Sequence, residues 1–151
     1  MSPTLVRADP REGQARALVE ASHALMQSLY PAEANHYLDL EALAAPEIRF
    51  FLAELEGRAL GCCALAVTED YGEVKSLFVD PAARGTGLGQ ALLAEIEAVA
   101  RAERLGWLKL ETGTGLDAAH GLYRAHGFQE CGPFGAYEAG PFSVFFEKRL
   151  R

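Results

Sequence analysis

The feature that most constrains this chain is a glycine-rich stretch between an apolar run and an amphipathic run. The segment DPAARGTGLGQALL, residues 80–93, directly follows SLFV and carries glycine at every second position from Gly85 to Gly89. Fixing glycines in place costs conformational entropy, so this alternation indicates a special backbone requirement. A helix start leaves N–H groups unpaired and partly positive, and glycines let an anion approach them without meeting a Cβ. The stretch therefore predicts a strand, a diphosphate-binding turn and a helix.

Two common diphosphate motifs do not fit this stretch. The dinucleotide fingerprint is GxGxxG, whereas here GxGxG is followed directly by Gln90. The nucleotide P-loop ends in Gly-Lys-Ser/Thr, and the stretch contains no lysine. The spacing and the short chain thus disfavour a nucleotide-binding half-domain of an oxidoreductase. A glycine-rich loop that only makes a tight turn remains the structural alternative.

A different family signature does fit. The arrangement Arg84-x-x-Gly87-x-Gly89 resembles the Q/R-x-x-G-x-G/A signature of the GCN5-related N-acetyltransferases, the GNAT superfamily. The later segment AAHGLYRAHGF, residues 118–128, resembles the A-x-x-L-Y-x-x-x-G-F segment of the same family, and the two segments occur in the family's order. The likeness is specific over residues 72–130 and is typical of small bacterial members. One departure is Leu116, which stands where the family often has a cofactor-contacting asparagine.

The hydrophobic pattern predicts one α+β domain spanning residues 1–151. Helical periodicity, with the signals that begin and end helices, predicts helices over residues 9–30, 37–44, 88–104 and 117–126. Short apolar or alternating runs predict strands over residues 49–56, 59–67, 73–79, 106–113, 128–130 and 142–150, the first three forming an antiparallel meander. The resemblance implies the α/β/α-layered GNAT fold. The central sheet of that fold is mixed but mostly antiparallel, with helices on both faces. It splays between the family's fourth and fifth strands, which correspond here to EVKSLFV and WLKLE.

The resemblance also implies acetyl-CoA as the acetyl donor and a set of residues that bind it. N–H groups in the turn would hold the diphosphate, and the end of the fourth strand would pair with the pantetheine arm as if it were an added strand. A backbone N–H near Phe78 would face the thioester oxygen. No metal is expected. The implied cofactor-binding residues are Leu77, Phe78, Val79, Arg84, Gly85, Thr86, Gly87, Leu88, Gly89 and Gln90.

Acyl transfer to an amine needs a proton donor for the leaving thiolate and a route for the amine proton. Tyr123 matches the family's proton-donating tyrosine, although a core aromatic on an amphipathic helix is the alternative. Glu73 begins the fourth strand, where histone-acetylating members of the family carry a catalytic glutamate, but a surface glutamate is equally compatible. Glu111 on the neighbouring strand is a weaker candidate for the base, and a water chain without a single base is a further possibility.

The predicted reaction is transfer of an acetyl group to a primary amine of a small molecule or a protein. Tyr30, Tyr71 and Tyr137 are candidates for the acceptor pocket, with packing near turns as the alternative. The competing function is a non-catalytic acyl-CoA-binding or regulatory module of the same fold. The acceptor, the acyl-chain preference and the oligomeric state do not follow from the sequence, although small family members are often homodimers.

Composition narrows the partners further. The formal net charge is −7 and no basic run occurs, which argues against nucleic-acid binding. No apolar run approaches a membrane span, and the N-terminal residues lack the segments of a signal peptide, so we expect a cytoplasmic protein without membrane association. The cysteines Cys62, Cys63 and Cys131 have no metal-ligand spacing and are interpreted as small core residues.

Overall fold

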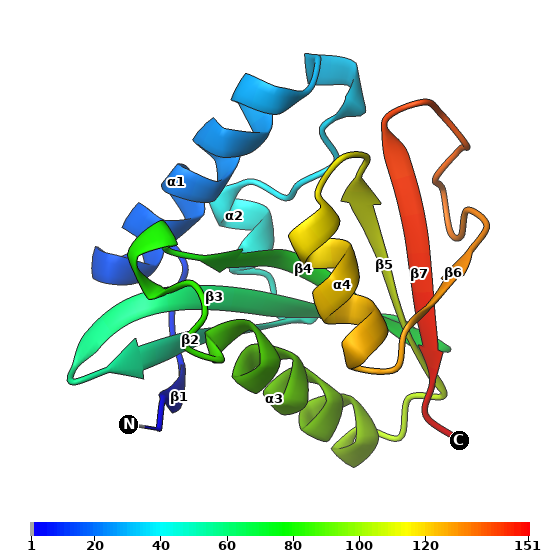
Figure 1. Ribbon diagram of the computed structural model, residues 1–151. Coiled ribbons are helices and arrows are strands. Elements are labelled where there is room, and N and C mark those ends of the chain that lie inside the picture. Colours follow the sequence, from blue (N-terminus) through cyan, green and yellow to red (C-terminus); the bar gives the residue numbers. More distant parts are fainter. Residues whose placement is uncertain (1) are drawn as a thin grey trace.

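The centre of the molecule is a twisted mixed sheet. A computed structural model describes residues 2–151, and their strands form one seven-stranded sheet in the order β1-β2-β3-β4-β5-β7-β6 (Figure 1). Every neighbouring pair is antiparallel except β4 and β5, which are parallel. The strands are β1 (Thr4–Arg7), β2 (Ile48–Leu55), β3 (Arg58–Val67), β4 (Tyr71–Val79), β5 (Trp107–Gly113), β6 (Gln129–Cys131) and β7 (Ser143–Arg149).

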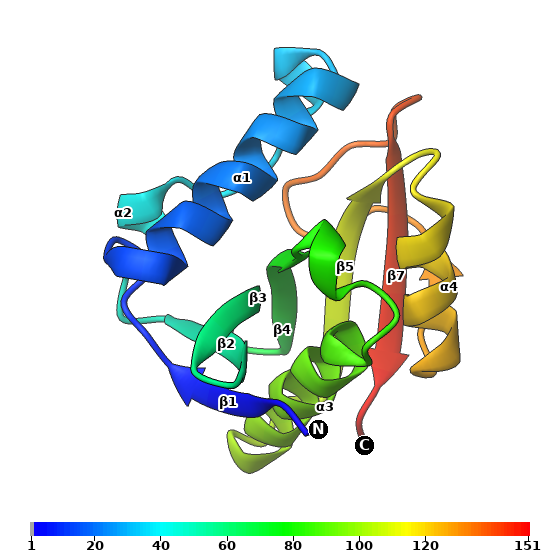
Figure 2. The same cartoon turned by 60° about the vertical axis from the view of Figure 1, so that its left-hand side comes forward.

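Helices cover both faces of this sheet, as the fold prediction required. One face carries α1 and α2 and the other carries α3 and α4, an arrangement that is clear when Figures 1 and 2 are compared. The helices are α1 (Gly13–Leu29), α2 (Leu40–Leu43), α3 (Leu88–Ala102) and α4 (Asp117–Ala125), with single 3-10 turns η1 (Ala32–Ala34) and η2 (Pro81–Ala83). The α+β fold class and the layered architecture are therefore confirmed.

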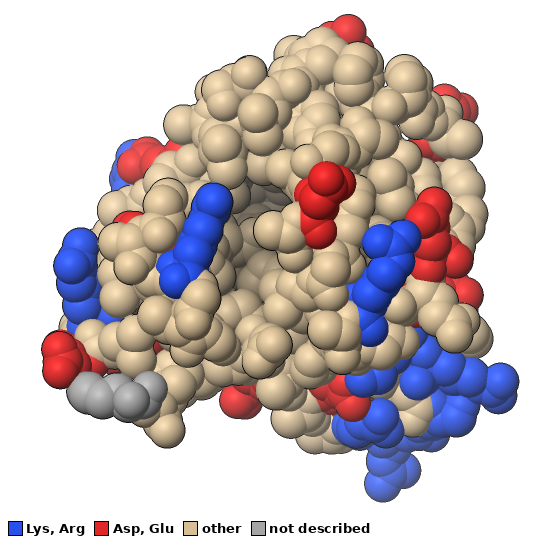
Figure 3. Space-filling view, in the orientation of Figure 1, with Lys and Arg blue, Asp and Glu red and all other residues tan. Residues whose placement is uncertain are grey.

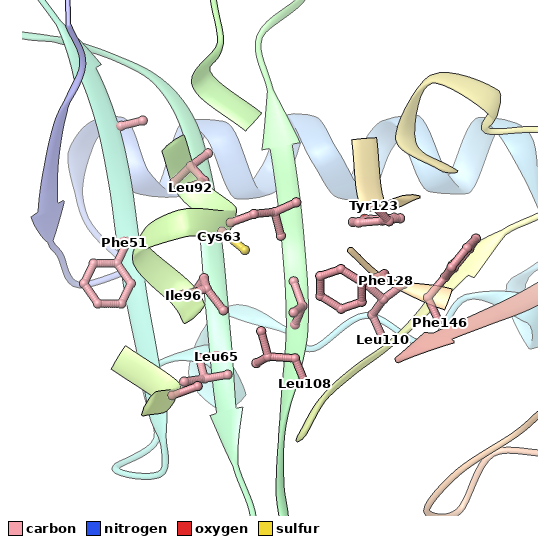
Figure 4. Close-up of a cluster of buried hydrophobic side chains, with 14 of the residues drawn as sticks. Phe51, Cys63, Leu65, Leu92, Ile96, Leu108, Leu110, Tyr123, Phe128 and Phe146 are labelled. Carbon is pink, nitrogen blue, oxygen red and sulfur yellow. The ribbon is translucent and has the colours of Figure 1, made fainter. Parts of the chain in front are cut away.

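Two hydrophobic cores follow from this layering. Leu92 and Ile96 of α3 are fully buried against Leu65 and Leu108 of the sheet, as Figure 4 shows. The opposite core packs the apolar stripe of α1 against the other faces of β2 and β3, including Cys62. Successive side chains of the sheet thus point into two different cores. For this reason β2 and β3 are apolar throughout and do not alternate apolar with polar residues.

The sheet opens between β4 and β5. These strands pair only at Tyr71–Trp107, Gly72–Leu108 and Glu73–Lys109, and Figure 1 shows them diverging beyond that end. A β-bulge in β4 lies opposite Cys63, because the register with β3 shifts between Lys75 and Phe78. Such a bulge bends its strand and increases its twist. The predicted splay between the fourth and fifth strands is therefore present.

The bulge has its own local chemistry. Ser76 adopts φ 55°, a left-handed conformation that a non-glycine residue rarely takes. The thiol of Cys62 donates to the Ser76 carbonyl over 3.3 Å. Burial raises the pKa of Cys62 to about 12, so the sulfur keeps its proton. Cys62 and Cys63 are buried core residues, as expected, and Cys62 also stabilises the bulge, whereas the same prediction is wrong for Cys131, which is only partly buried in the edge strand β6.

Candidate active site

The glycine turn has the geometry that the sequence predicts. The Asp80 side chain accepts a hydrogen bond from the Ala82 N–H over 2.9 Å and starts η2, after which the chain turns through Gly85 at φ 80° and Gly87 at φ 85°. Gly87 is the N-cap of α3 in a left-handed conformation. A Cβ at Gly85 or Gly87 would meet nothing within 4 Å, so the backbone is open on that side. The first turn of α3 therefore presents free N–H groups to an open space.

Gly89 serves a different purpose from the other two glycines. It already lies within α3, and a Cβ there would come within 2.8 Å of a methyl group of Leu122 on α4. Its missing side chain lets α4 lie close to the start of α3. The alternation of glycines thus combines two turn positions with one helix-packing position.

The turn forms one wall of a groove, which we call the donor groove, of about 670 Å³. Its other walls come from α1, the end of β4 and α4, and Figure 3 shows the hollow in this face with few charged side chains at its edge. Nine of the predicted cofactor-binding residues line it: Leu77, Phe78, Val79, Arg84, Gly85, Gly87, Leu88, Gly89 and Gln90. The tenth, Thr86, is exposed, and its hydroxyl donates to the Ala83 carbonyl.

A smaller space of about 140 Å³, the central cavity, lies where β4 and β5 separate. It shares Leu77 and Tyr123 with the donor groove. Ser76 also lines this cavity, and the buried hydroxyl oxygen of this residue has no hydrogen-bond partner. An unpaired buried hydroxyl costs about 1–3 kcal/mol, and the left-handed backbone at Ser76 adds strain. Both features are typical of a ligand site.

Tyr123 occupies the boundary between the groove and the cavity. Its side chain is 7% exposed and packs against the rings of Phe128 and Phe146 (Figure 4). Burial, with smaller contributions from Cys63 and Glu111, raises its pKa well above the ordinary value. The phenol is therefore protonated at neutral pH. His120, on the same helix, forms a hydrogen bond with the Gly113 carbonyl over 2.9 Å.

Glu111 points into the central cavity from β5. Its carboxylate accepts a hydrogen bond from the Ser143 hydroxyl over 2.8 Å. Burial raises its pKa above the ordinary glutamate value, because the charged form loses solvation. The geometry thus places a partly desolvated carboxylate in the same cavity as Tyr123.

Tyr30 closes the central cavity from the end of α1. Its hydroxyl donates to the Thr114 carbonyl over 2.6 Å. The ring lies directly on Gly113, where an added Cβ would approach the phenol oxygen to 2.1 Å. Gly113, to which the sequence assigned no role, is therefore required for Tyr30 to lie in this position.

The remaining predicted residues meet in a third space of about 740 Å³, the acceptor pocket. Glu73, Tyr71 and Tyr137 all line it, together with the loop between β6 and β7. The Tyr137 hydroxyl donates to the Glu73 carboxylate, and Lys75 lies 3.1 Å from the same carboxylate oxygen. Burial and the Glu73 charge both raise the pKa of Tyr137.

Among the residues of these two spaces that sequence reasoning missed, four bear on the chemistry. Lys75 and His36 line both the central cavity and the acceptor pocket, while Ser76 and Ser143 contribute the hydroxyls described above. Lys75 and Ser76 carried a usable signal, because both lie in the strand expected to open. Residues 2–151 contain no group of three His, Cys, Asp or Glu side chains arranged to hold a metal ion. None of the helices in the described part combines the length and apolar character needed to cross a bilayer.

Comparison with known proteins agrees with this geometry. The model of the acetyltransferase (GNAT) family matches residues 15–128. An IAA acetyltransferase of Azospirillum brasilense is 46% identical over 97% of both chains, and the uncharacterized N-acetyltransferase YedL of Escherichia coli K12 is 38% identical over 91% of this chain and 87% of its own. A solved Klebsiella pneumoniae structure, assigned as an acyl-CoA N-acyltransferase, superposes with a TM-score of 0.83 at 33% identity, covering 99% of this chain and 98% of that one.

The comparisons decide between the two functions that the sequence left open. The relatives with substantial identity along nearly the whole chain are acetyltransferases, which disfavours a non-catalytic acyl-CoA-binding module. The signature turn, the splayed strands and the buried tyrosine are all present in the described fold. The chain therefore belongs to the GNAT acetyltransferase family and is an acetyl-CoA-dependent N-acetyltransferase.

Proposed function

We propose that the enzyme binds acetyl-CoA in the donor groove and admits a primary amine, of a small molecule or a protein, through the acceptor pocket. The observation that carries this proposal is the sharing of walls between the three spaces. Tyr123 lines both the donor groove and the central cavity, and Lys75 lines both the central cavity and the acceptor pocket. A donor and an acceptor that occupy the outer two spaces would meet in the central cavity.

Two features of the chain fit acetyl-CoA. The open backbone at Gly85 and Gly87 leaves room for a diphosphate against the N–H groups at the start of α3. Ser76, whose buried hydroxyl has no hydrogen-bond partner, lines the cavity where the acyl end would lie. When bound, the cofactor supplies a thioester carbonyl for attack by the amine. In this proposal the residues from Gly85 to Gln90 bind the diphosphate, and those from Leu77 to Val79 pair with the pantetheine arm.

Tyr123 is the proposed proton donor to the departing sulfur. Its raised pKa keeps the phenol protonated, and its position between the groove and the cavity brings the hydroxyl to the region where the acyl group would lie. A thiolate leaves more readily when a positioned acid supplies its proton, and such an acid typically contributes about 10²–10⁴-fold to the rate.

Glu111 is the proposed acceptor of the amine proton. An alkyl ammonium has a pKa near 10, so it must lose a proton before the nitrogen can attack. Glu111 lies in the central cavity, and its raised pKa makes it a stronger base than an exposed carboxylate. Glu73, the other candidate for the base, lies in the acceptor pocket with Lys75 and Tyr137 bound to it. This difference favours Glu111, and paired Gln variants of the two residues test it.

The proposal is tested by a panel of amines with release of free thiol as the readout. We expect acetyl-CoA at about 100 times its dissociation constant to stabilise the protein by about 2.7 kcal/mol, and NAD at the same concentration to have no effect. We then expect thiol release only when a suitable amine is present. Stabilisation by acetyl-CoA without thiol release on any amine would contradict the proposed arrangement. Cytoplasmic location, possible homodimer formation and the lack of nucleic-acid binding remain predictions from the sequence.

A further inference from the structure

The acceptor side contains one buried lysine whose hydrogen-bonding capacity is already used. Lys75 is 10% exposed and lies in the walls of both the central cavity and the acceptor pocket. Its ammonium group lies 2.8 Å from the Tyr137 hydroxyl, 2.9 Å from the His36 carbonyl and 3.1 Å from a Glu73 carboxylate oxygen. An ammonium has three donors and no acceptor, so these three partners leave no N–H for a substrate.

The charge of Lys75 is also neutralised locally. Glu73 is only 14% exposed, and its carboxylate binds the ammonium while it accepts the Tyr137 hydroxyl. Apart from Lys75, no lysine or arginine among residues 2–151 lines the central cavity or the acceptor pocket. Glu111 lies in the cavity, and Glu33 and Glu138 lie at the exposed edge of the pocket. The path to the reaction centre therefore presents carboxylates and no available lysine or arginine.

We propose that the acceptor is a primary amine without a carboxylate beside the reacting nitrogen, and that Glu73 sets this preference by occupying Lys75. A free α-amino acid would bring its carboxylate into the cavity that already holds Glu111, with no lysine or arginine available to pair it. Like charges placed together without compensation disfavour binding strongly. Alkyl amines, amino-acid amides and peptide or lysine amines avoid this repulsion. The inference rests on the proposed function, since it takes Glu111 and the acceptor pocket as the amine's surroundings.

The wild-type enzyme provides the main test through three matched acceptors. Leucine, leucinamide and 3-methylbutylamine share one side chain, and leucine alone carries a carboxylate. We expect kcat/KM for leucine to be about 100-fold below that for leucinamide, compared at pH values where equal fractions of the two amines are neutral. Equal use of leucine and leucinamide would overturn the inference. Failure of all amines in the panel would instead overturn the proposed function.

Variants of the pair identify the residue responsible. We expect Glu73→Gln to reduce the ratio of kcat/KM for leucinamide to kcat/KM for leucine about tenfold, because Lys75 then has no charged partner and can bind a substrate carboxylate. The double variant Glu73→Gln with Lys75→Met should restore the high ratio. Glu20→Gln, which removes an exposed carboxylate of α1 that lies outside all three spaces, is the control and should leave the ratio unchanged. A ratio that stays high in Glu73→Gln, while this variant still acetylates leucinamide, would exclude Glu73 as the determinant.

Discussion

The donor groove and the acceptor pocket are built on opposite principles. The donor groove is made largely of backbone: the turn at Gly85 and Gly87, the first turn of α3 and the unpaired end of β4. The acceptor pocket is made of side chains, chiefly the hydrogen-bonded group of Glu73, Lys75 and Tyr137. A backbone site binds what every family member binds, whereas a side-chain site can change its ligand with few substitutions.

Tyr123 lies where the donor groove meets the central cavity, and Tyr123→Phe is the variant for which we predict the largest loss of activity. Removing one oxygen from this buried ring leaves its packing on Phe128 and Phe146 in place. We expect kcat to fall about 10²–10⁴-fold, because a positioned acid is lost, with acetyl-CoA affinity nearly unchanged. Stopped-flow turnover together with calorimetric titration of acetyl-CoA measures both quantities. Wild-type turnover in this variant would remove Tyr123 from the mechanism.

Glu111→Gln tests the side chain that is proposed to accept the amine proton. We expect kcat/KM to fall about 10²-fold, as for loss of a general base. In the wild type, activity should decline as pH falls through the raised pKa of Glu111, because the base must be unprotonated. The variant should lose that limb of the pH profile. The matched variant Glu73→Gln should keep it, and the reverse result would make Glu73 the base.

The same Glu111 variant makes a prediction about stability. A carboxyl whose pKa is higher in the folded state than in the unfolded state binds its proton more tightly when folded. Stability is therefore lost as pH rises from the unfolded value through the raised folded value. We expect Glu111→Gln to raise Tm at pH 8 and to leave it unchanged near pH 3. A lower Tm at pH 8 would show that the Ser143 contact outweighs the burial of charge.

Gly87→Ala tests the contribution of the backbone turn to acetyl-CoA binding. The residue has φ 85°, so any side chain is strained there, and the N–H groups that follow it must shift. We expect acetyl-CoA affinity to fall about tenfold, which corresponds to about 1.4 kcal/mol. Gly57→Ala is the matched control, since Gly57 has φ 78° in the β2–β3 hairpin and also has open space around it. Equal loss of affinity in both variants would attribute the effect to stability alone.

Gly89→Ala is the smallest change that we predict. The new Cβ would press on the flexible end of Leu122, so the cost depends on how far that side chain moves. We expect a decrease in Tm of about 2–4 °C, equivalent to about 1 kcal/mol in a chain of this size. Leu122→Ala in the same chain should remove most of the added penalty, a coupling that a double-mutant cycle measures.

The sequence predicted the glycine turn and the start of α3 well because their determinants are contiguous. Arg84 to Gln90 form one turn whose geometry follows from glycine and helix-start chemistry, and Tyr123 lies in a compact second motif. The acceptor side could not be predicted in the same way. Lys75 and Tyr137 bond across 62 positions of the chain, and no local pattern indicates such a pairing.

Errors at the start of the chain have a similar cause. The strand Thr4–Arg7 was not expected, because its four residues are half-exposed and are stabilised by pairing with β2. The predicted helix start at Asp9 was four residues too early. Asp9 instead binds the neighbouring Arg11, whose guanidinium lowers the carboxyl pKa to about 2, and α1 begins at Gly13. The Asp9 carboxylate also accepts the Arg11 backbone N–H over 2.9 Å, so it closes a turn before the helix.

The opening between β4 and β5 has a consequence for the mechanics of the molecule. Within residues 2–151, backbone pairing between the strands β1–β4 and the strands β5–β7 is limited to the residues from Tyr71 to Glu73 of β4, all at one end. A pantetheine chain paired along β4 would connect these two groups of strands at the end where β4 and β5 lie apart. Amide hydrogen exchange at Leu77 and Val79 should slow when the coenzyme binds, so that the rigidity of this enzyme follows the supply of its own co-substrate.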